Sequence, residues 1–188
     1  RNLKYIPYVG VRSTGNVRID YMLYNCLDLR AIPKGLDVSK MDGNGIDRLF
    51  QSVRECYDWS AFSDQGGLDA IERTSNFDMS YAFFNLDSLK VFPYFGQFTR
   101  ASNATGIFQG GTQIRRFDSQ YTHLDFTNCT DMQDAFNSMQ SLQELPPIHV
   151  NNLTNGNSLY RTFYICESLT AVKFVGMNAG PSNGEYYQ

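Results

Sequence analysis

Acidic side chains cluster in the first half of this chain, and two carboxylates at a suitable separation can hydrolyse a glycosidic bond. The candidates are Glu55, Asp58, Asp64, Asp69 and Glu72. A solvated acidic surface has the same composition, and the sequence does not decide which two side chains would meet. A carbohydrate-active hydrolase is therefore kept as an alternative of another class, and no catalytic residue is assigned.

A second stretch, residues 42–47, resembles a calcium-binding loop because glycines alternate with Asp and Asn. An EF-hand loop aligned on Gly45 needs carboxylates at its first and twelfth positions, which hold Lys40 and Gln51. A cation stands in place of the first ligand, and an amide stands in place of the bidentate ligand. The stretch is therefore predicted to be a glycine-rich turn.

Histidine and cysteine give no stronger metal or redox signal. His123 and His149 fall in corresponding segments of the repeat described below, but two histidines without a third ligand make a poor metal site. Cys26 and Cys166 occupy a repeat position filled elsewhere by Leu or Met, so they are predicted to be buried, reduced thiols. No nucleophile elbow, zinc-binding helix or phosphate loop is present, and we expect no enzyme, no metal and no cofactor.

Charge and hydropathy argue against two classes of partner. The 188 residues carry a net charge of −3 and a pI of about 5.3, which is not the footprint of a nucleic-acid-binding protein. No apolar run approaches the ~20 residues that span a bilayer, so no membrane insertion is expected. The chain begins at Arg1 without a signal segment, and we expect it to be a portion of a longer polypeptide.

The dominant pattern is a repeat in which a large apolar residue is followed by apolar residues at intervals of three, often with proline next. The first large residues of the units are Leu23, Phe83, Phe108, Phe136 and Phe163. The second unit is irregular, and its first residue is either Phe50 or Val53. Units of about 25 to 30 residues that cannot bury their own apolar face must stack on their neighbours.

Each unit is predicted to open with a short helix. Residues that cap helix N-termini stand five positions before the first large residue in four units, at Asp78, Asn103, Asp131 and Ser158. Strand-like apolar alternation closes several units. We therefore predict an α/β repeat, a leucine-rich-repeat-like solenoid of about five to six units, each a short capped helix plus a short strand.

Three regions follow from this pattern. Residues 1–17 are predicted to form an N-terminal cap or linker strand, and residues 18–175 the solenoid. Residues 176–188, rich in Gly, Asn and Ser, are predicted to be a C-terminal tail or linker. The polar insertion at residues 63–67 is expected to protrude as a loop.

Two stretches carry a resemblance to a known family. Residues 21–33 read Tyr-Met-Leu-Tyr-Asn-Cys-Leu-Asp-Leu-Arg-Ala-Ile-Pro, and residues 131–146 begin with Asp-Met and end with Ser-Leu-Gln-Glu-Leu-Pro. Over roughly residues 18–175 the chain resembles the BspA-type leucine-rich repeats and the mycoplasma lipoprotein-associated repeats. The resemblance implies an extracellular surface protein of bacteria, or a phage structural protein, that binds and does not catalyse.

The leading expectation is a non-enzymatic binding or structural module. It would be a phage virion component, such as a tail fibre or tip, that contacts a host surface or neighbouring subunits. A bacterial surface adhesin or lipoprotein is the alternative. The expected partner is a protein or glycan on a cell surface, or another structural subunit, with a homo-oligomer formed through flanking regions. The expected location is extracellular, on a virion or a bacterial cell surface.

Candidate contact residues lie between the buried positions of successive units, where side chains are predicted to face outward. They are Lys90, Tyr94, Arg115, Arg116 and Glu144. The aromatic stretch from Phe92 to Phe98 is expected to be the stronger part of this surface, because it holds more rings than one unit is expected to bury.

Overall fold

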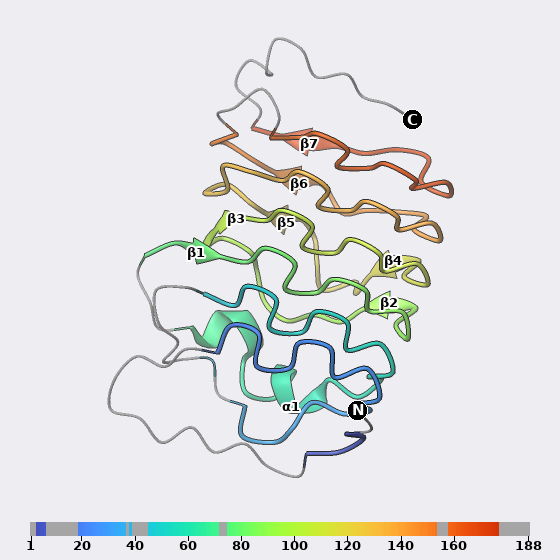
Figure 1. Cartoon of the computed structure of the whole chain (residues 1–188). Coiled ribbons are helices and arrows are strands. Elements are labelled where there is room, and N and C mark those ends of the chain that lie inside the picture. Colours follow the sequence, from blue (N-terminus) through green and yellow to red (C-terminus); the bar gives the residue numbers. More distant parts are fainter. Residues whose placement is uncertain are drawn as a thin grey trace.

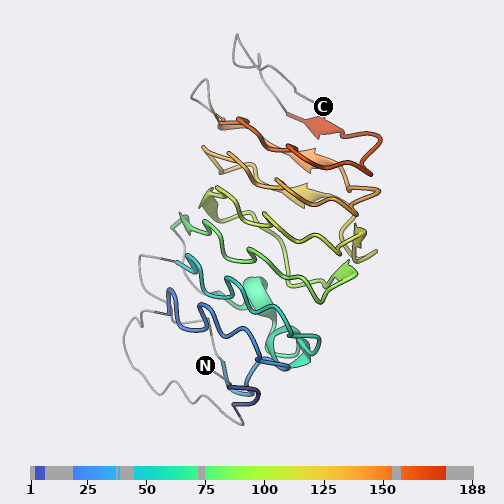
Figure 2. The same cartoon turned by 45° about the vertical axis from the view of Figure 1, so that its right-hand side comes forward.

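The computed structural model describes residues 3–6, 19–36, 38, 45–71, 75–153 and 158–176. Within these ranges the chain winds in successive circuits that lie above one another (Figure 1 and Figure 2). We call each circuit a layer and name it after one inward-pointing residue. In chain order these residues are Leu23, Phe50, Phe83, Phe108, Phe136 and Phe163. The predicted N-terminal region, C-terminal tail and calcium-like loop lie largely outside the described residues.

Regular secondary structure is sparse in this part of the chain. The helical elements are α1 (Ser60–Ser63) and the 3-10 helix η1 (Gly67–Ala70). The strands are β1 (Phe77–Asp78), β2 (Val91–Phe92), β3 (Ala101–Asn103), β4 (Arg116–Phe117), β5 (Leu124–Asp125), β6 (Ile148–His149) and β7 (Phe174–Val175). They form three parallel sheets, β1–β3, β2–β4 and β5–β6–β7. No helix among the described residues is long and apolar enough to cross a membrane.

The predicted fold class, an α/β leucine-rich-repeat-like solenoid whose units each hold a short capped helix plus a short strand, is wrong. The described part of the chain has one α-helix, which is four residues long and ends at Ser63, the first residue of the insertion in the second unit. Its strands gather in three small sheets that do not continue from one end of the molecule to the other. Where helices were expected, the layers contain consecutive tight turns.

Left-handed backbone explains why no helix forms in the layers. In every layer φ is positive at the residues two before and two after the naming residue. These residues are Tyr21, Asn25, Arg48, Ser52, Tyr81, Asn85, Gly106, Gly110, Asp134, Ser138, Arg161 and Ile165. A right-handed helix cannot include such residues, because the left-handed conformation reverses the course of the backbone.

Hydrogen bonds in these turns alternate between two directions. Every second N–H group donates to a carbonyl group in the following layer, while the N–H groups between them close turns within the layer. Phe50 donates to Ala82 at 3.0 Å, and Phe83 donates to Ile107 at 2.9 Å. The same bond recurs two positions before and two positions after the naming residue, and from the Phe50 layer to the Phe136 layer also four positions before it. Up to four rows of peptide groups therefore connect neighbouring layers.

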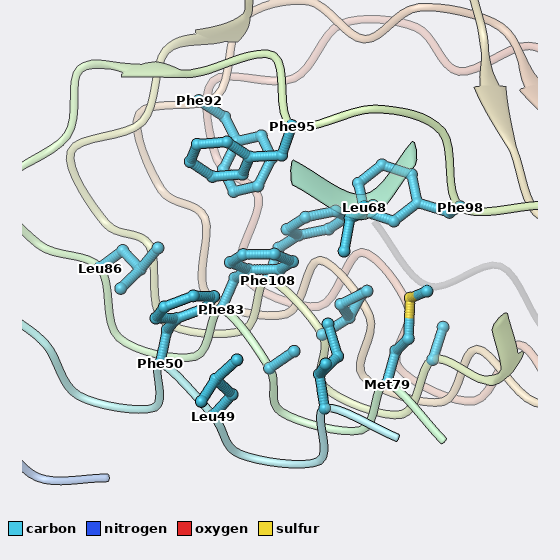
Figure 3. Packing of buried hydrophobic residues seen from close by; sticks show 14 of the residues in the cluster. Leu49, Phe50, Leu68, Met79, Phe83, Leu86, Phe92, Phe95, Phe98 and Phe108 are labelled. Atoms are coloured by element: carbon cyan, nitrogen blue, oxygen red, sulfur yellow. The ribbon is translucent and has the colours of Figure 1, made fainter. Parts of the chain in front are cut away.

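The side chains of the naming residues form one apolar column. Successive ring centroids from Phe50 to Phe163 are 5.6, 6.0, 5.2 and 5.3 Å apart. Figure 3 shows Phe50, Phe83 and Phe108 in this column, with further rings against them. The column and the hydrogen-bond register identify Phe50, and not Val53, as the first residue of the second unit.

The residues expected to cap helices close turns instead. A side-chain oxygen of Asp78, Asn103 or Asp131 accepts a hydrogen bond from the N–H group two residues later, at 2.7, 2.9 and 2.8 Å. This is the Asx turn, which uses the same acceptor chemistry as a helix cap. The Ser158 hydroxyl donates to the carbonyl group of Thr130 in the preceding layer.

Residues 63–66 of the insertion predicted to protrude are exposed, whereas Gly67 and the residues on either side of the insertion contact the core. The Ser63 hydroxyl donates to the Tyr94 carbonyl group at 3.3 Å, and the Leu68 N–H group donates to the Phe95 carbonyl group. Phe62 and Leu68 are buried. The two ends of the insertion are therefore held against the aromatic core, and its middle is exposed.

Candidate contact surface

Four of the five predicted contact residues are exposed: Lys90, Arg115, Arg116 and Glu144. Strands β2 and β4 lie side by side in Figure 1, and Val91 of β2 is in register with Arg116 of β4. The Arg115 N–H group donates to the Lys90 carbonyl group at 2.9 Å. The structure therefore brings Lys90, Arg115 and Arg116 together on adjacent layers, and we call these three residues the basic strip.

Glu144 lies one layer further on. The N–H group of Gln143, its neighbour in sequence, donates to the Arg115 carbonyl group at 2.8 Å. Backbone hydrogen bonds thus connect the basic strip to a polar continuation formed by Gln143 and Glu144, both exposed.

The basic strip has no carboxylate partner in the part of the chain that the structure describes. The ion pairs found there join other cations, namely Arg48 with Asp47 at 3.3 Å, Arg54 with Asp87 at 3.5 Å and Arg161 with Asp134 at 2.9 Å. Unpaired cations on neighbouring layers reinforce each other's potential and favour anionic partners.

Tyr94, the fifth predicted contact residue, is half-buried. Its ring packs on Tyr121 with centroids 4.7 Å apart. Burial raises the pKa of Tyr94, and the charge of Asp69 adds to this effect. Tyr94 therefore offers less free surface than the basic strip.

The wider prediction that the stretch from Phe92 to Phe98 forms an exposed contact surface is wrong. Phe92, Phe95 and Phe98 are 0%, 1% and 0% exposed. Rings from other layers bury them, and Phe126 stacks on Phe98 at 4.9 Å. Sequence reasoning compared these rings with the capacity of one unit, but neighbouring layers and the insertion share their burial.

Tyr57 belongs to the same exposed row and was missed by the sequence analysis. It lies seven positions after Phe50, as Lys90 lies seven positions after Phe83, and it is 68% exposed. Its N–H group donates to the carbonyl group of Arg30, another exposed cation, at 3.2 Å. The ambiguity between Phe50 and Val53 concealed this register.

Two of the acidic residues considered for hydrolysis accept hydrogen bonds that hold the nearby backbone in place. Asp58 accepts from the hydroxyl and N–H groups of Ser60 at 2.7 and 3.1 Å, and these bonds lower the pKa of Asp58. Asp69 accepts from the N–H group of Gln97 at 3.1 Å. Glu55 and Asp64 are exposed, while the fifth candidate, Glu72, lies outside the described residues.

The two histidines lie side by side. The rings of His123 and His149 stack with centroids 4.4 Å apart and planes inclined by 22°. Face-to-face stacking does not point their nitrogen atoms at one ion. Among the described residues, no three His, Cys, Asp or Glu side chains converge as a metal site.

All four cysteines are free thiols. Burial raises the pKa of Cys56 and Cys129 to about 12 and that of Cys166 to about 11. These three thiols therefore stay protonated at neutral pH, which makes them weak nucleophiles. Cys26 and Cys166, predicted to be buried, are only partly so, because they lie in the first and last layers.

The molecule is a stack of layers with an exposed basic strip. No family model, curated protein or solved structure matches this chain. The resemblance to BspA-type repeats stays a prediction from the residues.

Proposed function

We propose that this chain is a non-enzymatic binding module that attaches to an anionic protein or glycan through its basic strip. The observation that carries the proposal is the set of three exposed cations, Lys90, Arg115 and Arg116, which have no carboxylate partner among the described residues. They gather on adjacent layers of a chain whose net charge is −3.

The backbone beneath the strip is suited to recognising a repeating anion. Paired strands hold neighbouring side chains about 4.8 Å apart, so ordering the strip on binding costs little further backbone entropy. Arginine binds carboxylate or phosphate groups through two parallel hydrogen bonds, and lysine adds a mobile point charge. Tyr57 extends the row with an aromatic face, which suits contact with a sugar ring or an apolar side chain.

We further propose that the module is displayed outside the cell, as a component of a phage particle such as a tail fibre or tip. The support for this setting is the resemblance of residues 21–33 and 131–146 to repeats found in surface and virion proteins. A binding role of this kind needs no cofactor.

The test compares two double variants of equal charge. Arg115→Ser with Arg116→Ser removes two cations from the strip, whereas Lys34→Ser with Lys173→Ser removes two exposed cations outside it. Binding of labelled protein to intact bacterial cells and to immobilised polygalacturonate, a carboxylated glycan, is measured across a range of salt concentrations.

We expect the wild type to bind more weakly as salt rises, because salt screens exposed charges. The strip variant is expected to lose about tenfold in affinity, since each exposed charge contact contributes about 0.5–1 kcal/mol. The control variant is expected to bind like the wild type. Equal losses in both variants, or binding that ignores salt, would contradict the proposal.

A further inference from the structure

The rows of hydrogen-bonded peptide groups end differently at the two ends of the stack. In the Phe163 layer, the N–H groups of Arg161, Phe163 and Ile165 have no acceptor among the described residues. In the Leu23 layer, the carbonyl groups of Met22 and Tyr24 receive no hydrogen bond from any described residue. We call these sets the donor row and the acceptor row. Figure 1 places the two layers at opposite ends of the described stack.

The two rows are complementary in register. Inside the chain, three N–H groups of each layer donate hydrogen bonds to carbonyl groups of the next layer. They belong to the naming residue and to the residues two positions before and after it. In the last such contact, Phe136 donates to Thr162 at 2.9 Å and Ser138 donates to Tyr164 at 2.8 Å. A Leu23 layer placed on a Phe163 layer would repeat this contact along residues 21–25, with Phe163 donating to Met22 and Ile165 donating to Tyr24. The contact would end beside residues 3–6, because the Arg30 N–H group of the Leu23 layer already donates to the Lys4 carbonyl group at 3.1 Å.

The direction of the peptide groups determines which ends of two copies can form hydrogen bonds with each other. Peptide groups aligned along the rows add their dipoles, so the donor row is electrostatically positive and the acceptor row negative. Two donor rows facing each other would leave every N–H group without an acceptor, which is costly in a dry interface. The ends therefore favour contact between unlike ends over contact between like ends.

In the described part of the chain, the large exposed apolar side chains other than Tyr57 lie in the Leu23 layer, in the Phe163 layer or in the N-terminal segment. With Tyr57 included, they are Leu3, Tyr5, Tyr21, Met22, Tyr24, Leu27, Tyr57, Tyr160, Tyr164, Ile165 and Val175. In the described part of the chain, none falls between Tyr57 and Tyr160. Leu142 is fully buried, whereas Leu169, its equivalent in the last layer, is half-buried because no described layer covers it.

We propose that copies of this chain associate head to tail, with the Leu23 layer of one copy lying on the Phe163 layer of another. A second copy supplies acceptors at the spacing of the donor row and apolar side chains opposite apolar ones. The contact joins unlike surfaces, so each associated pair keeps one free end of each kind. It does not involve the basic strip and does not depend on the function proposed for it.

The test blocks each end with a charge. Met22→Lys places a cation on the Leu23 layer, where Met22 is 36% exposed, and Val172→Lys places one on the half-buried end face of the Phe163 layer. Gln143→Lys is the control, because it adds the same charge at an exposed position of the Phe136 layer. Circular dichroism checks that each variant is folded.

Sedimentation velocity is measured over a range of chain concentrations. We expect the mass of the wild type and of Gln143→Lys to rise with concentration, while each end variant alone stays monomeric. An equimolar mixture of the two end variants is expected to form a one-to-one dimer and nothing larger, because each variant retains the end that its partner lacks.

Two results would overturn the proposal. A wild type that stays monomeric at every concentration would exclude association through the ends. Met22→Lys has only its Phe163 layer unblocked. If this variant associates with itself and does not bind Val172→Lys in the mixture, like ends meet. Amide hydrogen exchange gives an independent readout, since the N–H groups of Arg161, Phe163 and Ile165 should exchange more slowly only when the chain associates.

Discussion

The ring of Tyr81 lies where a Cβ atom on Gly106 would have to be. Both residues occupy the position two before the naming residue of their layers, with φ of 53° and 57°. With the Tyr81 ring in its present place, a side chain at this left-handed position of the next layer would collide with the ring, which glycine avoids. Close stacking of equivalent positions decides which layers can carry which residue types.

Gly106→Ala is expected to destabilise the fold. The left-handed conformation costs a residue with a Cβ atom about 1–2 kcal/mol, and displacement of the Tyr81 ring adds to this cost. Chemical denaturation measures the free energy of unfolding. Combining Gly106→Ala with Tyr81→Ala separates the two contributions, since the double variant keeps the backbone strain and lacks the clash. A neutral Gly106→Ala variant would contradict the assigned conformation.

Ile165 is the least suited residue at the left-handed position two after the naming residue. The other layers have Asn25, Ser52, Asn85, Gly110 and Ser138 there. A branched Cβ is strongly disfavoured at the φ of 59° that Ile165 adopts. Its side chain is 37% exposed, so shortening it removes little buried surface.

Ile165→Asn is therefore expected to stabilise the protein by about 1 kcal/mol, because it relieves backbone strain. Thermal unfolding followed by circular dichroism measures the gain. Ile165→Val keeps the branched Cβ and serves as the control, which should show no gain. Equal stability of all three proteins would mean that the position carries no strain.

The apolar register could be predicted from the sequence, but the local conformation could not. Leu23, Phe83, Phe108, Phe136 and Phe163 were predicted to form one column because each begins the same run of apolar residues in units that must stack. Within a unit, spacings of three and four residues were taken to indicate a helix. A helix and a ladder of tight turns share these spacings, so periodicity favoured the wrong element. The two glycines of the Phe108 layer, with Asn25 and Asn85, are residue types that tolerate left-handed backbone, but Tyr, Arg, Ser and Ile fill most of the equivalent positions in the other layers.

Part of the candidate contact surface could also be predicted from the sequence. Lys90, Arg115 and Arg116 were predicted to face outward because they lie between buried positions, and they are exposed. Tyr57 was missed because the register of its unit was ambiguous. The donor and acceptor rows were beyond sequence reasoning, since they depend on the direction in which each peptide group points and on which layers lie at the ends.

Phe136→Ala and Asp131→Ala are expected to differ in cost. Phe136 is fully buried between the rings of Phe108 and Phe163, so its removal should open a cavity and cost about 3–5 kcal/mol. Asp131→Ala removes the acceptor of one turn and should cost about 0.5–1.5 kcal/mol. Asp131→Asn keeps an acceptor oxygen and is the control. Urea denaturation that ranks the two alanine variants in the opposite order would refute the assignment of core and turn.

The stability of the fold is expected to fall in alkaline solution, partly because of Cys129. Burial raises the pKa of this thiol from its ordinary value of 9.0 to about 12. Between these values the unfolded chain releases the proton while the folded chain keeps it. The contribution of Cys129 is therefore complete below about pH 9 and is lost as pH rises toward 12, at up to about 1.4 kcal/mol per pH unit.

Cys129→Ala tests this linkage. Below pH 9.0 the variant should be less stable than the wild type by a constant amount, since a buried side chain has been shortened. Above that pH the difference should shrink, because the wild type alone carries the titrating thiol. Met139→Ala, which shortens a buried side chain that does not titrate, should stay below the wild type by the same amount at every pH. The free energy of unfolding is measured from pH 7 to about 11 by chemical denaturation under reducing conditions. Parallel curves for Cys129→Ala and the wild type would show that the thiol ionises equally in the folded and unfolded chains.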